Sequence, residues 1–252
     1  MSFRIVIPAR FASTRLPGKP LREICGKPMI VHVIERAQQS DATEVIVATD
    51  SKEITRAIAH LDIRVCMTHE NHQSGTERLS EVIEQLGFDD DEILINLQGD
   101  EPMMPPICLN QVGQALENDH DLKMATLCTP LTDINELFDP HAVKVVRDIN
   151  DFALYFTRAA VPWSRDSFNE KPRTMPTQQQ YQRHIGLYGY RAGFVRQYLD
   201  WPASDIEKTE SLEQLRVLYH GEKIKVITAA IPPGPGVDTI DDLNRVCELL
   251  KN

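Results

Sequence analysis

The chain has 252 residues, enough for one large α/β core with an inserted subdomain or for two domains. Its 27 Lys and Arg against 37 Asp and Glu give a formal charge of −10, which disfavours non-specific binding to nucleic acid or to an anionic membrane. Five cysteines without a Cys-x-x-Cys pair argue against a disulfide framework and a zinc ribbon, and no segment has the roughly 20 uninterrupted apolar residues of a membrane span. These features predict a reduced, cytoplasmic protein with no nucleic-acid or membrane partner.

The first expected strand, residues 4–8, runs directly into a loop with three cations. Arg10, Arg15 and Lys19 lie in this loop, interleaved with prolines and a glycine that fix the backbone. Covered parallel strands present ligands at their carboxyl edge, so the loop is predicted to bind an anion, with a nucleoside triphosphate as the obvious candidate. It is not a P-loop, because Pro20 follows Lys19 where Ser or Thr is required. An ordinary solvated surface loop is the alternative.

Strand-like and helix-like segments alternate through the first half, as in parallel βαβ units. Helices are expected at 28–39, 52–60, 77–86 and 107–117, and strands at 44–48, 64–67, 92–97 and 123–128. Between residues 142 and 191 the pattern changes to strands without intervening helices, at 143–146, 152–156 and 185–190. Helices at 194–199 and 211–219, a strand at 223–228 and a helix after 239 complete the chain.

This order predicts an α/β fold with a Rossmann-like, mostly parallel sheet flanked by helices. We expect one domain over residues 1–252, with residues 142–191 as an antiparallel extension and dimer platform.

Two aspartates stand where a metal could bind. Asp100 follows the strand at 92–97, and Asp238 lies in a Pro/Gly-rich loop. If folding brings them together, they offer the hard oxygen ligands that suit magnesium. The alternatives are that Asp238 caps the last helix and that Asp100 is a turn carboxylate.

The histidines give weaker signals. His69 and His72 are three residues apart and lack the H-E-x-x-H spacing, so we assign them ordinary surface roles. His184 and Tyr188 are evenly spaced on an expected strand and so share one face. His184 could equally be a core or interface histidine or a ligand contact.

Several sequence blocks, in family order, resemble the 3-deoxy-manno-octulosonate (Kdo) cytidylyltransferases, or CMP-Kdo synthetases, of the nucleotidyltransferase superfamily. The resemblance extends from Ile5 to the last helix. It rests on the blocks at 7–20, 48–50, 72–78, 96–102, 155–162, 184–191, 210–216 and 236–239, among them N-x-Q-G-D-E-P and H-I-G-L-Y-G-Y-R.

The resemblance implies a Mg²⁺-dependent transfer of CMP from CTP to the anomeric hydroxyl of Kdo, giving CMP-Kdo and pyrophosphate for lipopolysaccharide synthesis by a homodimer. It implies roles for the site residues: catalysis by Lys19, Arg15, Asp100 and Asp238; nucleotide binding by Ala9, Arg10, Arg15, Lys19, Ser74 and Gly75; sugar binding by Gln98, Arg158, His184, Tyr188 and Glu213; and metal binding by Asp100 and Asp238. The extension at 142–191 would contribute to the sugar pocket.

Two other functions remain open from the sequence. One is a cytidylyltransferase for another acid sugar such as N-acylneuraminate, although the block at 184–191 favours Kdo. The other is a non-catalytic nucleotide-binding regulator on the same fold, which should lack one of the two metal carboxylates.

Overall fold

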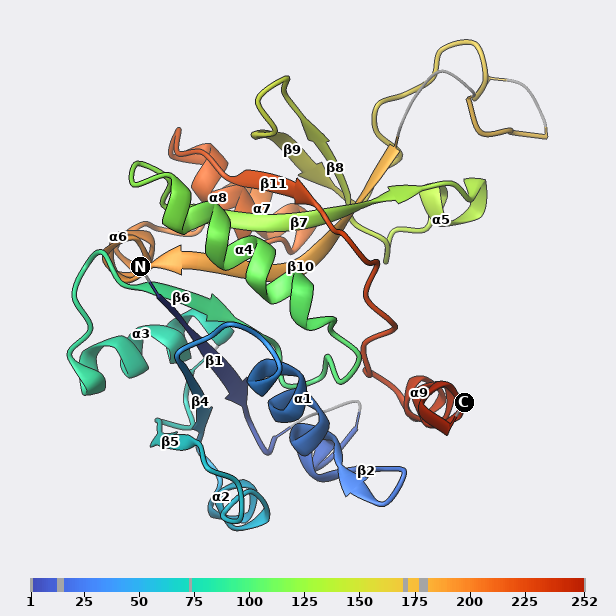
Figure 1. Ribbon diagram of the computed structural model, residues 1–252. Coiled ribbons are helices and arrows are strands. Elements are labelled where there is room, and N and C mark those ends of the chain that lie inside the picture. Colours follow the sequence, from blue (N-terminus) through green and yellow to red (C-terminus); the bar gives the residue numbers. More distant parts are fainter. Residues whose placement is uncertain (1, 13–15, 73, 170–171, 177–180, 252) are drawn as a thin grey trace.

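The computed structural model describes residues 2–12, 16–72, 74–169, 172–176 and 181–251 (Figure 1). Its main sheet has the strand order β11-β7-β10-β6-β1-β4-β5, and all of these strands except β10 run in the same direction. The parallel strands are β1 (Phe3–Ala9), β4 (Glu44–Thr49), β5 (Arg64–Met67), β6 (Ile93–Asn96), β7 (Met124–Leu131) and β11 (Lys225–Thr228). The predicted mostly parallel α/β fold is confirmed.

The antiparallel strands come from the segment in which they were expected. β8 (Lys144–Arg147) and β9 (Ala153–Thr157) form an antiparallel pair, and β8 also contacts β10 (Tyr181–Arg191). β10 itself lies between β6 and β7 in the main sheet. The antiparallel segment is therefore joined to the central core through β10.

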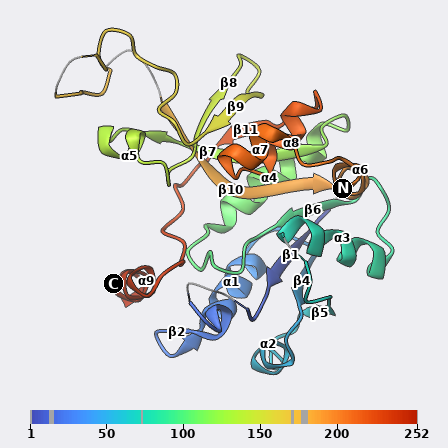
Figure 2. The same ribbon diagram turned by 180° about the vertical axis from the view of Figure 1, so that it is seen from behind.

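Helices cover both faces of the sheet, as the two opposite views show (Figures 1 and 2). α1 (Met29–Gln38), α2 (Lys52–Ala57) and α4 (Pro106–Asn118) contribute to one buried cluster, and α3 (Gly75–Leu86), α6 (Ala192–Asp200) and α8 (Gln214–Tyr219) contribute to the other. β1 shows why: Ile5 and Ile7 face the first cluster while Val6 faces the second. Successive side chains of a strand point to opposite faces of the sheet. Because helices cover both faces here, the consecutive residues 5–7 of the strand are all apolar.

The elements that sequence patterns did not predict are all short. They are the 3-10 turn Lys19–Leu21, β2 (Glu23–Ile24), β3 (Lys27–Pro28), α5 (Ile134–Phe138) and α7 (Asp205–Glu210). Each is too short to display a hydrophobic period. α7 did carry a readable signal, because Ser204 and Glu207 form a capping box at its start.

The segment after the last strand crosses back to the elements that follow β1. After β11, residues 229–239 run to α9 (Ile240–Lys251), which packs near β2 (Figure 1). Leu243 and Val246 of α9 are buried with Ile24, Met29 and Val237. This return places the Pro/Gly-rich loop beside the loop that follows β1.

Within the described ranges, no helix has both the length and the apolar character needed to cross a bilayer.

Two glycines of β10 give a matched test of the packing between the sheet and α4. A Cβ on Gly189 would lie 2.6 Å from Val112 Cγ1 and 2.8 Å from Leu116 Cδ1, whereas one on Gly186 would meet nothing within 4 Å. We expect Gly189→Ala to lower the free energy of unfolding by about 1–3 kcal/mol and Gly186→Ala to change it by less than about 0.5 kcal/mol, measured by urea denaturation. Equal stability of the two variants would contradict this packing.

Candidate functional site

Two adjoining cavities lie beyond the carboxyl ends of β1 and β6. The first has a volume of about 310 Å³ and the second about 330 Å³. Gly75, Gln98 and Glu213 line both. Two ligands bound in these cavities would therefore lie next to each other, and both would contact these three residues.

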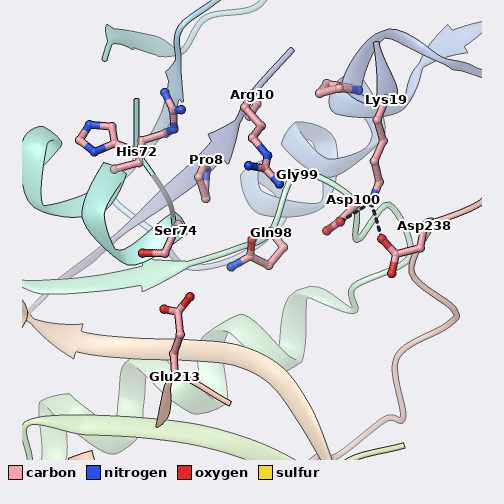
Figure 3. A pocket seen from close by; sticks show the side chains of 14 residues that line it. Pro8, Arg10, Lys19, His72, Ser74, Gln98, Gly99, Asp100, Glu213 and Asp238 are labelled. Carbon is pink, nitrogen blue, oxygen red and sulfur yellow. Dashed lines mark hydrogen bonds and ion pairs between the residues drawn. The ribbon is translucent and has the colours of Figure 1, made fainter. Parts of the chain in front are cut away.

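Lys19, Asp100 and Asp238 form an ion cluster at one end of the first cavity (Figure 3). Lys19 Nζ donates to Asp100 Oδ2 at 2.6 Å and to Asp238 Oδ1 at 2.8 Å. Burial alone would lower the pKa of Lys19, but the two carboxylates outweigh it and raise the pKa. The prediction that folding brings the two distant aspartates together is confirmed.

Backbone contacts bring the Asp238 segment to Asp100. The Val237 amide donates to the Asp100 carbonyl at 2.9 Å, and the Val237 side chain is buried. Gly236 permits this approach, because a Cβ there would lie 2.9 Å from Glu101 Oε1. Asp238 therefore reaches the cluster through the packing of its loop.

The cap of α9 does not use the Asp238 side chain. Thr239 Oγ1 accepts from the Asp242 amide at 3.2 Å, and Asp242 Oδ2 accepts from the Thr239 amide at 2.9 Å, which is a reciprocal capping arrangement. The alternative that Asp238 caps the last helix is thus not realised, since Thr239 takes that role.

The two aspartates fit a divalent cation. Their carboxylate oxygens converge on a single nitrogen, and hard oxygen donors are what Mg²⁺ prefers. Burial, followed by the charges of Asp100 and Asp238, raises the pKa of the neighbouring Glu101 to about 8, so Glu101 adds little negative charge at neutral pH. No cluster of three or more His, Cys, Asp or Glu suited to a metal occurs among the described residues. A cation here would complete its coordination with water or phosphate oxygens.

The predicted nucleotide-binding residues that the structure describes all line the first cavity. Ala9 ends β1, Arg10 points into the cavity in Figure 3, and Ser74 and Gly75 begin α3. Ser74 Oγ caps α3 by accepting from the Glu77 amide at 3.1 Å. The amino terminus of α3 therefore faces the cavity, where it favours negative charge. Arg15 lies outside the described residues.

Asp50 supports the start of the cation loop, a role that sequence reasoning did not find. Its Oδ1 accepts from the Phe11 amide at 3.2 Å, and its Oδ2 accepts from Arg78 Nη2 at 3.0 Å. Arg78 is buried and also donates to Thr68. Arg78, which itself lines the first cavity, thus links α3 through Asp50 to the residue after Arg10.

His72 lines the first cavity and hydrogen-bonds to Glu81 of α3. Partial burial works to raise the pKa of Glu81, but hydrogen bonds from His72, the His69 amide and Gln85 lower it. Both histidines thus help to fix the loop before α3.

His184 and Tyr188 lie on one face of β10 and both line the second cavity. Their ring centroids are 5.3 Å apart, and His184 Nε2 is 3.1 Å from Thr126 Oγ1. Burial lowers the pKa of His184 to about 3. His184 is therefore a neutral imidazole at physiological pH and contributes shape and hydrogen bonding.

Among the described residues, three of those that line the second cavity have a buried polar side-chain atom without a hydrogen-bond partner. These atoms are Asn96 Oδ1, the Tyr188 hydroxyl and Gln214 Nε2. Asn96 and Gln214 were not predicted, although each lies within a recognised sequence block. The wall of the second cavity therefore combines polar and aromatic residues.

Glu213 stands at the junction of the two cavities and points toward Ser74 and Gln98 in Figure 3. Its Oε2 accepts from Thr76 Oγ1 at 3.2 Å, which connects α8 to α3. Burial raises the pKa of Glu213 above its usual range.

The structure does not place Arg158 on the described wall of either cavity. Its guanidinium donates to the carbonyls of Glu210 at 2.7 Å and Pro140 at 2.9 Å. Its backbone amide donates to the Glu210 carboxylate at 2.9 Å. Arg158 holds the segment that leads to Glu213, and direct contact with a ligand stays a prediction.

Comparisons with known proteins agree on the family. A family profile described as cytidylyltransferase matches residues 4–224. The chain is 52% identical over 252 residues to 3-deoxy-manno-octulosonate cytidylyltransferase 1 of Hydrogenovibrio crunogenus, covering all of this chain and 97% of the relative. It is 54% identical over 249 residues to a 3-deoxy-manno-octulosonate cytidylyltransferase of Idiomarina loihiensis, covering 99% of this chain and 98% of the relative.

Solved structures give the same result. A CMP:2-keto-3-deoxy-manno-octonic acid synthetase complexed with CTP superposes with a TM-score of 0.90 at 42% identity, covering 100% of this chain and 99% of the other. A 4-diphosphocytidyl-2C-methyl-D-erythritol synthase from Anaerococcus prevotii shares only the fold, with a TM-score of 0.61 at 13% identity, covering 100% of this chain and 97% of the other. The profile match and the full-length relatives confirm the resemblance found in the sequence blocks, and the chain belongs to the cytidylyltransferase family.

Proposed function

We propose that this chain transfers CMP from CTP to the anomeric hydroxyl of Kdo, with release of pyrophosphate. The observation that carries the proposal is the pair of cavities with a shared wall. The first cavity holds Arg10, Lys19 and the amino terminus of α3, which suit a triphosphate. The second is lined mainly by polar and aromatic side chains, with Glu213 on the shared wall, which suit a sugar. The full-length relatives and the CTP-complexed synthetase carry the same activity in their names.

The reaction forms a bond between the anomeric oxygen and the α-phosphorus, while the bond from that phosphorus to the α–β bridging oxygen breaks. The hydroxyl proton is released and pyrophosphate leaves. Negative charge grows on the phosphate oxygens, and Lys19 and Arg10, which line the first cavity, would stabilise it. The wall formed by Gly75, Gln98 and Glu213 keeps the two substrates adjacent, which lowers the entropic cost of their encounter.

Asp100 and Asp238 would hold Mg²⁺. When bound, this ion neutralises phosphate charge and lowers the pKa of a coordinated hydroxyl. The carboxylates themselves fix the ε-ammonium of Lys19, so their removal would also leave that cation without its two partners.

Further roles are part of the same proposal. Arg15 would extend the cation loop, and Arg158 would act on the sugar side, either in contact with Kdo or through Glu210. The product would serve lipopolysaccharide synthesis in the cytoplasm. The chain would act as a single domain and form a homodimer, supported by exposed apolar side chains at Ile149, Leu154 and Trp163 in the antiparallel segment.

The deciding experiment measures pyrophosphate release from CTP with Mg²⁺ against a panel of acid sugars that includes Kdo and N-acetylneuraminate. We expect release with Kdo at a kcat/KM at least about 100-fold above that with any other sugar, because a site built for sugar hydroxyls rejects mismatched ones. A higher kcat/KM with another acid sugar would mean that this sugar, and not Kdo, is the substrate. Absence of release with every sugar, despite CTP binding, would indicate a regulator.

The acidic pair should act mainly on turnover. We expect Asp100→Ala and Asp238→Ala to reduce kcat by roughly 100-fold or more, because they remove groups that serve the charged transition state. The dissociation constant for CTP, measured by calorimetry without sugar, should change less than about 5-fold. Asp241→Ala, an exposed carboxylate in the first turn of α9, is the matched control. Equal losses in turnover and CTP binding would contradict the assignment.

His184 should not titrate in the physiological range. Burial lowers the pKa of His184 from 6.5 to about 3, so the ring stays neutral in the folded state. In the unfolded chain the ring would be protonated below about pH 6.5. Nitrogen-detected NMR of labelled imidazoles should show no inflection for His184 between about pH 5 and 8, with His184→Gln identifying its resonance. Acidification through this window should destabilise the parent more than the variant. A midpoint near the ordinary value of 6.5 would contradict the burial.

A further inference from the structure

Residues 229–239 carry Asp238 from the end of β11 to the ion cluster, and they do so without forming a helix or a strand. Pro232, Pro233 and Pro235 have no amide hydrogen, so these three positions cannot donate a backbone hydrogen bond. The position of the segment therefore has to come from the elements that it lies against.

The helix α4 holds the first residues of this segment. Gln111 Nε2 donates to the Thr228 carbonyl at 3.1 Å, and Gln111 Oε1 accepts from the Ala230 amide at 2.8 Å. One turn earlier on the same helix, Cys108 Sγ donates to the Ile231 carbonyl at 3.3 Å. One face of α4 thus binds three backbone groups of the chain that leaves β11.

The two hydrogen bonds of Gln111 use both ends of its amide. A backbone carbonyl only accepts and a backbone amide only donates, so Thr228 meets the NH₂ group and Ala230 meets the oxygen. A carboxylate of the same length lacks the donor, and a thioether lacks the donor and is only a weak acceptor. Because it binds two residues at once, Gln111 fixes where the chain lies along α4.

The same alignment continues from α4 to the ion cluster. A Cβ on Gly234 would lie 2.8 Å from Met103 Cβ, so the backbone passes close to that side chain. Three residues later, the Val237 amide donates to the Asp100 carbonyl at 2.9 Å. Residue numbers rise along the segment while those of its partners fall. The segment therefore runs in the opposite direction along the stretch from Asp100 to Gln111, in a single register.

This register decides where Asp238 lies. A slip by one residue moves each group of an extended segment by roughly 3.3–3.6 Å. Such a shift exceeds the tolerance of a hydrogen bond, so Asp238 Oδ1 would lose its 2.8 Å contact with Lys19 Nζ. Correct register where the chain leaves β11 is thus a condition for the ion cluster.

We propose that Gln111 is a positioning residue, which holds the segment after β11 in register with α4 and thereby places Asp238 beside Asp100 and Lys19. Gln111 lies outside the described walls of both cavities, so it acts on the reaction through this segment. The kinetic consequence rests on the proposed function, whereas the structural consequence can be measured without substrates.

The first test follows amide hydrogen exchange by NMR in the substrate-free protein. Gln111→Met keeps the side-chain length and removes both bonds, so the Val237 amide should exchange about 3- to 10-fold faster. The Phe88 amide, which bonds to the Ile83 carbonyl at the end of α3, should change less than about 2-fold. A general loosening of the fold would raise both rates. Gln114→Met is the matched control, because Gln114 is exposed on the same helix, and it should leave both rates unchanged.

The second test measures pyrophosphate release with CTP and Kdo. Gln111→Met should lower kcat by about 3- to 10-fold and change KM for CTP by less than about 2-fold, because a displaced Asp238 serves the transition state less well. Gln114→Met should leave both constants unchanged. Gly234→Ala perturbs the same segment at another point, where its Cβ meets Met103, and should also lower kcat.

Three results would overturn the inference. They are unchanged Val237 exchange in Gln111→Met, an equal loss of kcat in Gln114→Met, and faster Val237 exchange with an unchanged kcat. Failure of the parent to release pyrophosphate with Kdo would instead overturn the proposed function. The exchange measurement would then still decide whether Gln111 holds the segment that carries Asp238.

Discussion

A single backbone hydrogen bond, from the Val237 amide to the Asp100 carbonyl, marks the contact on which the site depends. It joins the segment after β6 to the loop before α9, and burial of the Val237 side chain secures the joint. Only with this contact can Asp238 stand beside Asp100 with Lys19 between them. Like charges so close together would repel, and the ammonium group offsets that repulsion.

Cations, a helix amino terminus and carboxylates surround the first cavity, whereas amides, aromatic rings and a neutral imidazole surround the second, with the Glu213 carboxylate on the shared wall. Gly99 allows the segment after β6 to approach β1 beside the first cavity, because a Cβ there would lie 2.9 Å from the Pro8 carbonyl oxygen. Glu213 and Thr76 then connect the two sides through one hydrogen bond.

Sequence patterns predicted the long elements well because burial imposes a period on them. β1, β4 and β6 are covered on both faces, and their apolar runs were readable without a structure. The role of Asp50 was not readable, since its partners Phe11 and Arg78 are 39 and 28 residues away. Asn96 and Gln214 were hidden for a related reason: nothing local reveals that a polar side chain will be buried without a partner. The sugar-side role of Arg158 stays a prediction from resemblance, since its guanidinium donates to the backbone carbonyls of Glu210 and Pro140 in this structure.

The contact between the segments that follow β1 and β11 also sets a temporal order. The ion pair between Lys19 and Asp238 spans 219 residues, so it can form only after every strand of the main sheet has been synthesised. A nascent chain that ends after β11 contains Lys19 and Asp100 but lacks the second carboxylate. The cluster of three charges can therefore assemble only after the sheet that carries it has been made.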